Sequence, residues 1–142
     1  MRNPISFILF LFYYIFYKLY SWAKRLGVDD APEWTALFTV SWFPFLNTLT
    51  LIVGIGLVSG DRIQLPIVTW STKITFLLVY LVFHYFIFIH KGKYKLIVEH
   101  FRNETEEKGR RGTIYTTIYI ILTFGLFFSS IYLMSLRNRG VI

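Results

Sequence analysis

The feature that most limits the fold is a set of three apolar stretches, each long enough to cross a lipid bilayer. Residues 36–58 and 114–136 contain no Asp, Glu, Lys or Arg, and residues 67–89 contain only Lys73 of these types. A helix needs about 20 mostly apolar residues to cross the hydrocarbon core. Charged residues make up 16% of the chain, against about 25% in soluble domains, which is too few to cover a water-exposed surface. The sequence therefore predicts an all-α integral membrane helical bundle.

The path of the N-terminal stretch is open. Residues 5–17 are apolar, and a full span is reached only by including Lys18, whose amine can extend to the interface from near a helix end. A polar face at helical spacing would instead suit a helix lying in the membrane plane; it consists of Tyr13, Tyr17, Tyr20 and Lys24. Because no small-residue cleavage site follows, we expect the segment to remain in the mature chain.

We predict one domain over residues 1–142 with four transmembrane helices. The alternative has three spans and an in-plane N-terminal helix. The four helices are expected at about 5–23, 33–58, 67–90 and 113–136.

The longest polar connection, about 90–112, is predicted to contain a helix of its own. An apolar cluster at residues 96–98 and 101 is followed by Glu104 and Lys108 at a favourable i,i+4 spacing, which indicates an amphipathic cytoplasmic segment over 93–108. Gly92 is expected to bend the chain at its start. The other connections are short, and Gly27 and Pro32 favour a tight hairpin between the first two helices.

Basic residues are distributed unevenly between the two predicted sides. With four spans, ten lie on the side of residues 18–30 and 90–112, against five on the other. Since Lys and Arg are enriched in cytoplasmic loops, we expect both of those connections inside and both termini outside, in a bacterial inner membrane. The net charge of +7 is thus assigned to membrane lipid and not to nucleic acid.

Two polar residues, Asn47 and Tyr80, fall at a similar depth in the predicted spans, and His84 lies about one turn nearer the cytoplasm. Asn47 is costly in hydrocarbon unless its amide is hydrogen-bonded, and Tyr80 and His84 are its expected neighbours. A cluster of these three could bind a polar group or pass a proton. The favoured interpretation is a structural interhelical hydrogen bond, because no carboxylate lies within a span.

Small residues recur in the second and fourth apolar stretches and predict close helix packing. The second span carries Gly54, Gly56 and Gly60, with Pro44 expected to kink it. The last span carries the stripe Thr116, Thr123 and Ser130, and the pair Gly125 and Ser129. Packing inside the bundle is favoured over a dimer face or a polar conduit.

The basic residues of the long connection are candidates for contact with lipid headgroups or a partner. Each would attract an anionic membrane surface by about 1 kcal/mol, although Glu104, Glu106 and Glu107 oppose this. Ordinary positive-inside topology is the favoured explanation for the set, which is Lys91, Lys93, Lys95, Arg102, Lys108, Arg110 and Arg111.

Reactive chemistry has little support in the sequence. The chain has no cysteine, which excludes disulfides and thiolate sites, and no nucleophile elbow, phosphate loop or HExxH motif occurs. We predict no metal and no cofactor. An enzyme acting on lipid would have to use His90, Glu99 and His100, and is the least favoured hypothesis.

Three segments resemble a group of small bacterial, Bacteroidota-like, multi-helix membrane proteins of unknown function. They are FYYIFYKLY at 12–20, FLNTLT at 45–50 and HFRNE at 100–104. The resemblance would cover most of the chain. It implies a bacterial inner-membrane location and supplies no site residue.

The favoured function is that of a non-enzymatic membrane protein. It would act through helix–helix association, as a homo-oligomer or as a small accessory subunit that binds a membrane protein partner. A membrane immunity-type protein belongs to the same class. The alternative from another class is a subunit of a small oligomeric transporter or channel that uses the polar cluster.

Overall fold

The computed structural model describes residues 4–27, 30–59 and 69–140, and the regular structure in these ranges is entirely helical. The predicted all-α fold is therefore confirmed for this part of the chain. The elements are α1 (Pro4–Arg25), α2 (Pro32–Ser59), α3 (Trp70–Phe88), the 3-10 turn η1 (His90–Gly92), α4 (Lys93–Arg102) and α5 (Glu106–Asn138).

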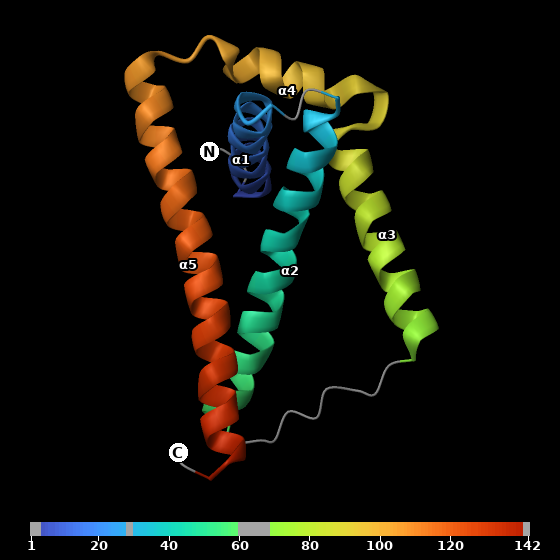
Figure 1. Ribbon diagram of the computed structural model, residues 1–142, viewed down its shortest axis with the longest axis vertical. Coiled ribbons are helices and arrows are strands. Elements are labelled where there is room, and N and C mark those ends of the chain that lie inside the picture. Colours follow the sequence, from blue (N-terminus) through green and yellow to red (C-terminus); the bar gives the residue numbers. More distant parts are fainter. Residues whose placement is uncertain (1–3, 28–29, 60–68, 141–142) are drawn as a thin grey trace.

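Three helical segments are long and apolar enough to cross a membrane: Pro32–Ser59, Trp70–Arg102 and Glu106–Asn138. Helices α2, α3 and α5 run along the length of the molecule, and α4 lies across their upper ends in Figure 1. Helix α1 packs on α2 at this same end and is foreshortened in the view, so it crosses the direction of the long helices.

The turn between α3 and α4 depends on two residues in the left-handed backbone region. Lys91 has φ 56° and Gly92 has φ 74°, a conformation that glycine adopts without steric penalty. The expected bend at Gly92 is present. It turns the chain from the lengthwise α3 into the transverse α4.

The prediction of one helix over 93–108 is wrong. Helix α4 ends at Arg102, and after Asn103 and Glu104 a new helix, α5, starts at Glu106 with the Thr105 side chain accepting from the Lys108 amide. The i,i+4 pair of Glu104 and Lys108 is therefore not made, because the Glu104 carboxylate turns towards α1 instead. Helix α5 accordingly begins at 106 and not at 113.

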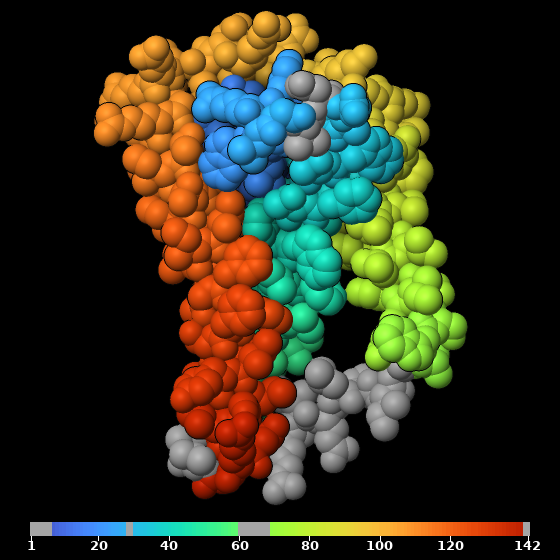
Figure 2. Space-filling view, in the orientation of Figure 1, coloured from blue at the N-terminus to red at the C-terminus, as the bar shows by residue number. Residues whose placement is uncertain are grey.

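The core lies at the end where α1, α2, α4 and the last turns of α3 meet. Phe16, Phe43 and Phe88 are fully buried there, and the rings of Phe16 and Phe88 stack with centroids 5.0 Å apart. Along α3 only His84 and Phe88 are buried. Figure 2 shows the consequence, an open gap between α2 and the lower part of α3.

Candidate functional site

A buried polar network joins α1 to the junction of α4 and α5. Lys18 is only 6% exposed. Its Nζ forms an ion pair with Glu104 Oε1 and donates to the carbonyl of Gly109 at 3.1 Å, while the Tyr14 hydroxyl donates to Glu104 Oε2 at 2.8 Å. A buried charge is tolerated when it is paired and its remaining hydrogen bonds are made. Both conditions hold here.

Two aromatic rings complete the surroundings of the ammonium group. Lys18 Nζ lies 5.2 Å from the ring centroid of Tyr14 and 5.4 Å from that of Tyr17, within the range of a cation–π attraction. Burial, followed by the Glu104 carboxylate, raises the pKa of the Tyr14 hydroxyl. Tyr14 therefore stays protonated and remains a donor to Glu104.

The close approach of α1 to α5 at this point requires a glycine. A Cβ on Gly112 would lie 1.7 Å from the hydroxyl oxygen of Tyr14. No real contact is that short, so any other residue would displace the Tyr14 ring, and with it the hydrogen bond to Glu104, or push the two helices apart. Packing against Tyr14 therefore explains the glycine at position 112, although the sequence alone gave Gly112 no role.

Beside this network, α1 and α5 diverge and leave an apolar groove. Its volume is about 280 Å³. One side is open, since Ile8 and Tyr115 are more than half exposed. The lining residues are Ile8, Leu11, Phe12, Tyr14, Ile15, Tyr115, Thr116 and Tyr119.

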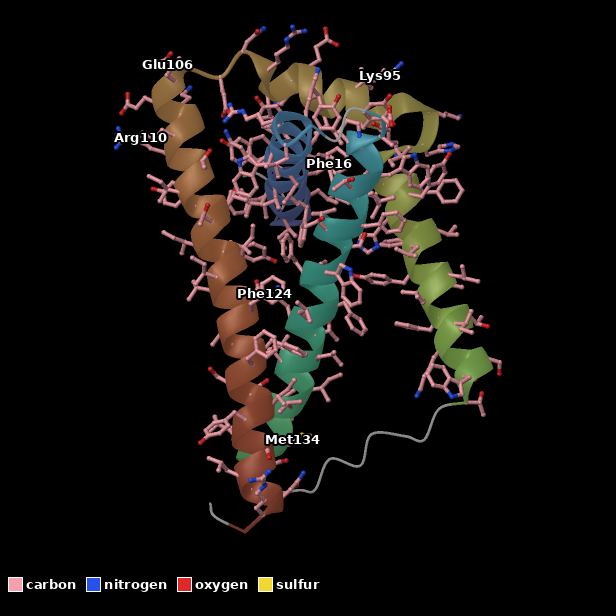
Figure 3. All side chains as sticks on the ribbon, viewed as in Figure 1. Phe16, Lys95, Glu106, Arg110, Phe124 and Met134 are labelled. Atoms are coloured by element: carbon pink, nitrogen blue, oxygen red, sulfur yellow. The ribbon has the colours of Figure 1, made fainter. Side chains whose placement is uncertain are left out.

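The basic residues predicted to contact lipid or a partner are exposed, and they lie on η1, α4 and the first turns of α5. In Figure 3, Lys95 and Arg110 point away from the bundle. Lys93 also donates to the carbonyl of Phe86 at 2.9 Å, near the end of α3. Beneath them, Ile97 and Phe101 are the buried residues of α4.

The polar residues predicted to form one cluster are divided between two contacts. The Asn47 amide donates to the Tyr119 hydroxyl at 3.0 Å, and so joins α2 to α5. The Tyr80 hydroxyl donates to the Ser41 carbonyl at 2.6 Å, and its ring lies 4.3 Å from that of His84. The carbonyl of the preceding residue, Val40, receives no hydrogen bond within the helix, because Pro44 lacks an N–H. Tyr119 is thus the partner that sequence reasoning missed.

The stripe of small residues on α5 is buried at all three positions. Thr116, Thr123 and Ser130 have little exposed area, and α5 packs on α2. On α2, Gly56 is buried, and its carbonyl accepts a hydrogen bond from Arg137 at 2.9 Å. Gly60 lies outside the described residues.

Other small residues have open space around them. A Cβ added to Gly54 or Gly125 would meet no atom of another residue within 4 Å, and Gly125 and Ser129 are both exposed. Gly125 follows Thr123 by two residues, a rotation of about 200°. The Gly125–Ser129 pair therefore lies on the side of α5 opposite to its buried stripe, and we call this side the outer face of α5.

The three residues considered for lipid chemistry do not form a cluster of hydrogen bonds. His90 packs near Tyr85 and Phe86, and His100 packs on Phe10 and Phe101. Within the described ranges, no group of three or more His, Cys, Asp or Glu residues could hold a metal ion.

Comparison with known proteins gives no match: no protein-family model, no curated protein and no solved structure is significantly similar to the chain.

The Lys18 network is a further feature that sequence reasoning missed. Lys18 was expected to extend its amine to the interface, yet it is buried and paired with a residue 86 positions away. One indication was available: a lysine with Tyr14 and Tyr17 beside it on the same face, in an otherwise apolar run, needs a carboxylate partner if that face packs. Nothing in the sequence singled out Glu104 from its neighbouring glutamates.

Proposed function

We propose that this chain is a multi-pass membrane protein that acts without catalysis, by associating with another transmembrane helix through the outer face of α5. The observation that carries the proposal is the two-sided character of α5. One side is buried, mainly against α2, while Gly125 and Ser129 on the other side are exposed with open space at Gly125.

The physical reason lies in how helices associate in lipid. Hydrocarbon tails are as apolar as leucine, so exposed apolar side chains do not by themselves drive association, whereas small residues at i and i+4 let two backbones approach closely. Neighbouring residues on the outer face are larger and flank the pair: Ile121, Leu122, Phe128 and Tyr132 are all exposed. The first candidate for the second helix is α5 of another copy.

Association is tested by changing two glycines with open space at Cβ, Gly125 and Gly54, in turn. Gly125→Ile adds the same side chain as Gly54→Ile, and both sites are open, but only the first lies on the outer face of α5. We expect Gly125→Ile to weaken self-association in liposomes by about tenfold, or about 1.4 kcal/mol, and Gly54→Ile to leave it unchanged. The measurement is energy transfer between labelled copies over a series of lipid-to-protein ratios.

A second measurement detects self-association without a substitution that weakens it. Because the chain contains no cysteine, Ser129→Cys introduces a single thiol on the outer face, and oxidation in native membranes should give a disulfide-linked dimer. A chain that stays monomeric in both experiments, and that cannot be crosslinked to any membrane protein from Ser129→Cys, would overturn the proposal.

The proposed topology has α2, α3 and α5 as spans and α1 at the cytoplasmic surface. This arrangement is supported by the contacts of α1 with α4: Phe10 packs on Phe101, Tyr17 packs on the same ring, and Tyr20 packs on Tyr94. From Phe10 to Tyr20, about 15 Å of helix, α1 stays in contact with the transverse α4. Ten basic residues at this end favour the cytoplasmic side.

Topology is tested with single cysteines and an impermeant maleimide in intact bacterial cells. Asn138→Cys should label, and Asp30→Cys and Asn103→Cys should be protected. Asn3→Cys decides the path of α1: protection supports a surface helix, and labelling would mean that α1 crosses the membrane as a fourth span.

A further inference from the structure

The groove between α1 and α5 has two features of a lipid-binding site. Its wall is apolar apart from hydroxyl groups, including those of Tyr14, Tyr115 and Thr116. At about 280 Å³ it is slightly smaller than the roughly 300–1,000 Å³ typical of pockets for compact small molecules. A narrow groove with one open side suits a single flexible chain that enters from the surrounding lipid.

Positive charge stands at one end of this groove. Lys108 and Arg111 precede Tyr115 on α5 by seven and four residues, which are two turns and one turn of the same helix face. Both are exposed. Arg111 pairs with Glu107 at 2.6 Å, but their side chains are 69% and 73% exposed, and such surface pairs exchange easily for another anion.

We propose that the α1–α5 groove binds one acyl chain of an anionic glycerophospholipid, whose phosphate is held by Lys108 and Arg111. The acyl chain contacts Leu11 and Ile15 of α1 and Tyr119 of α5. The headgroup stays at the α4 end, where the other exposed basic residues lie. This lipid site is separate from the outer face of α5, so it does not depend on the proposed function.

The buried network explains why the groove is a fixed feature of the fold. The Lys18–Glu104 ion pair and the contact of Tyr14 with Gly112 hold α1 against α5 at the upper end of the groove. Beyond that point the helices diverge, and the groove opens where Ile8 and Leu11 of α1 are exposed. A bound lipid would fill space that neither helix can close without breaking these contacts.

The test compares phosphatidylglycerol with phosphatidylcholine. The purified, delipidated full-length chain in detergent is titrated with each lipid, and bound molecules are counted by native mass spectrometry. Two cationic side chains near an anionic group contribute about fivefold each, so we expect one phosphatidylglycerol to bind about 25-fold more tightly than phosphatidylcholine. Equal binding of the two lipids by the wild-type chain would overturn the proposal.

Variants separate the acyl groove from the headgroup contacts. Leu11→Trp, and independently Ile8→Trp, fill the groove from its exposed wall and should abolish the binding of both lipids. The double variant Lys108→Gln/Arg111→Gln should retain the weaker binding of phosphatidylcholine and lose the preference for phosphatidylglycerol.

A matched control removes the same charge elsewhere. Arg110 directly precedes Arg111, but one step along a helix turns the side chain by about 100°, and Figure 3 shows Arg110 pointing away from the bundle. Arg102→Gln/Arg110→Gln should keep the full preference. If this control loses the preference as completely as Lys108→Gln/Arg111→Gln, the attraction is a diffuse surface effect and the site assignment is wrong.

Discussion

The two ends of this bundle are held together by different interactions. At the α4 end, four helices meet around buried aromatic rings and a buried ion pair. At the other end α2 and α5 stay together, with Arg137 donating to the carbonyls of Gly56 and Leu57, while the start of α3 stands apart with its apolar side chains exposed. Polar groups in lipid need partners and pull helices together, whereas apolar side chains can be left to the lipid.

The largest expected effect is at the closed end. Glu104→Ala leaves Lys18 buried without its carboxylate, and removal of one partner of a buried pair costs about 3–5 kcal/mol. Unfolding in a detergent series should detect this loss. The matched control is Glu107→Ala, which removes an exposed ion pair that takes no part in the network and should change stability by at most about 1 kcal/mol. Equal effects would mean that the network does not hold the closed end together.

A glycine substitution tests the helix approach itself. Gly112→Ala places a methyl group in the position of the Tyr14 hydroxyl, and such overpacking costs about 1–3 kcal/mol. Gly125→Ala adds the same methyl group in open space and should be neutral or stabilise the helix by a few tenths of a kcal/mol or more. If both variants melt at the same temperature, α1 is not held against α5 as described.

The sequence predicted the long helices more accurately than it predicted their contacts. Runs of apolar residues at 36–58, 67–89 and 114–136 were sufficient to place α2, α3 and α5, because helix length follows from bilayer thickness. The break at residues 103–105 was missed. Helical spacing of Glu104 and Lys108 favours a continuous helix locally, and the ion pair that competes with it comes from α1, 86 positions away.

The residues of the candidate site were likewise easier to predict than their contacts. The exposed basic residues could be predicted because charge must stay near water. By contrast, the partner of Asn47 could not: Tyr80 and Tyr119 were both tyrosines on facing spans, and depth along a helix does not determine which side of α2 each one meets. The contact with Tyr119 follows from the packing of α5 on α2.

A smaller effect is expected at the far end of α2. Arg137→Gln removes a cation that donates to carbonyls in the last turn of this helix, where the helix dipole is negative, and the loss should be about 1 kcal/mol or less. Hydrogen exchange should rise in α2 from Val53 onwards and stay constant from Ala36 to Phe43. Unchanged exchange at both places would show that α2 and α5 hold together there through packing alone.

The smallest effect is expected on the part of α3 that stands apart. Phe76 is 61% exposed, whereas Phe88 on the same helix is 2% exposed. Phe76→Ala should alter the free energy of unfolding by less than about 0.5 kcal/mol. Phe88→Ala is the matched control and should be clearly more destabilising, because it leaves a cavity among packed rings. A large effect of Phe76→Ala would mean that this part of α3 packs against another surface and that the gap beside α2 closes.

The separation of Lys18 and Glu104 along the chain also sets an order of events during synthesis. The 86 positions from Lys18 to Glu104 take about 4–17 s to translate at about 5–20 residues per second. For that interval the ammonium group of Lys18 has no Glu104 carboxylate with which to pair, and an unpaired charge is costly to bury. The contacts of α1 with α2 can form early, whereas its contacts with the α4–α5 junction can form only after residues 93–109 have been made.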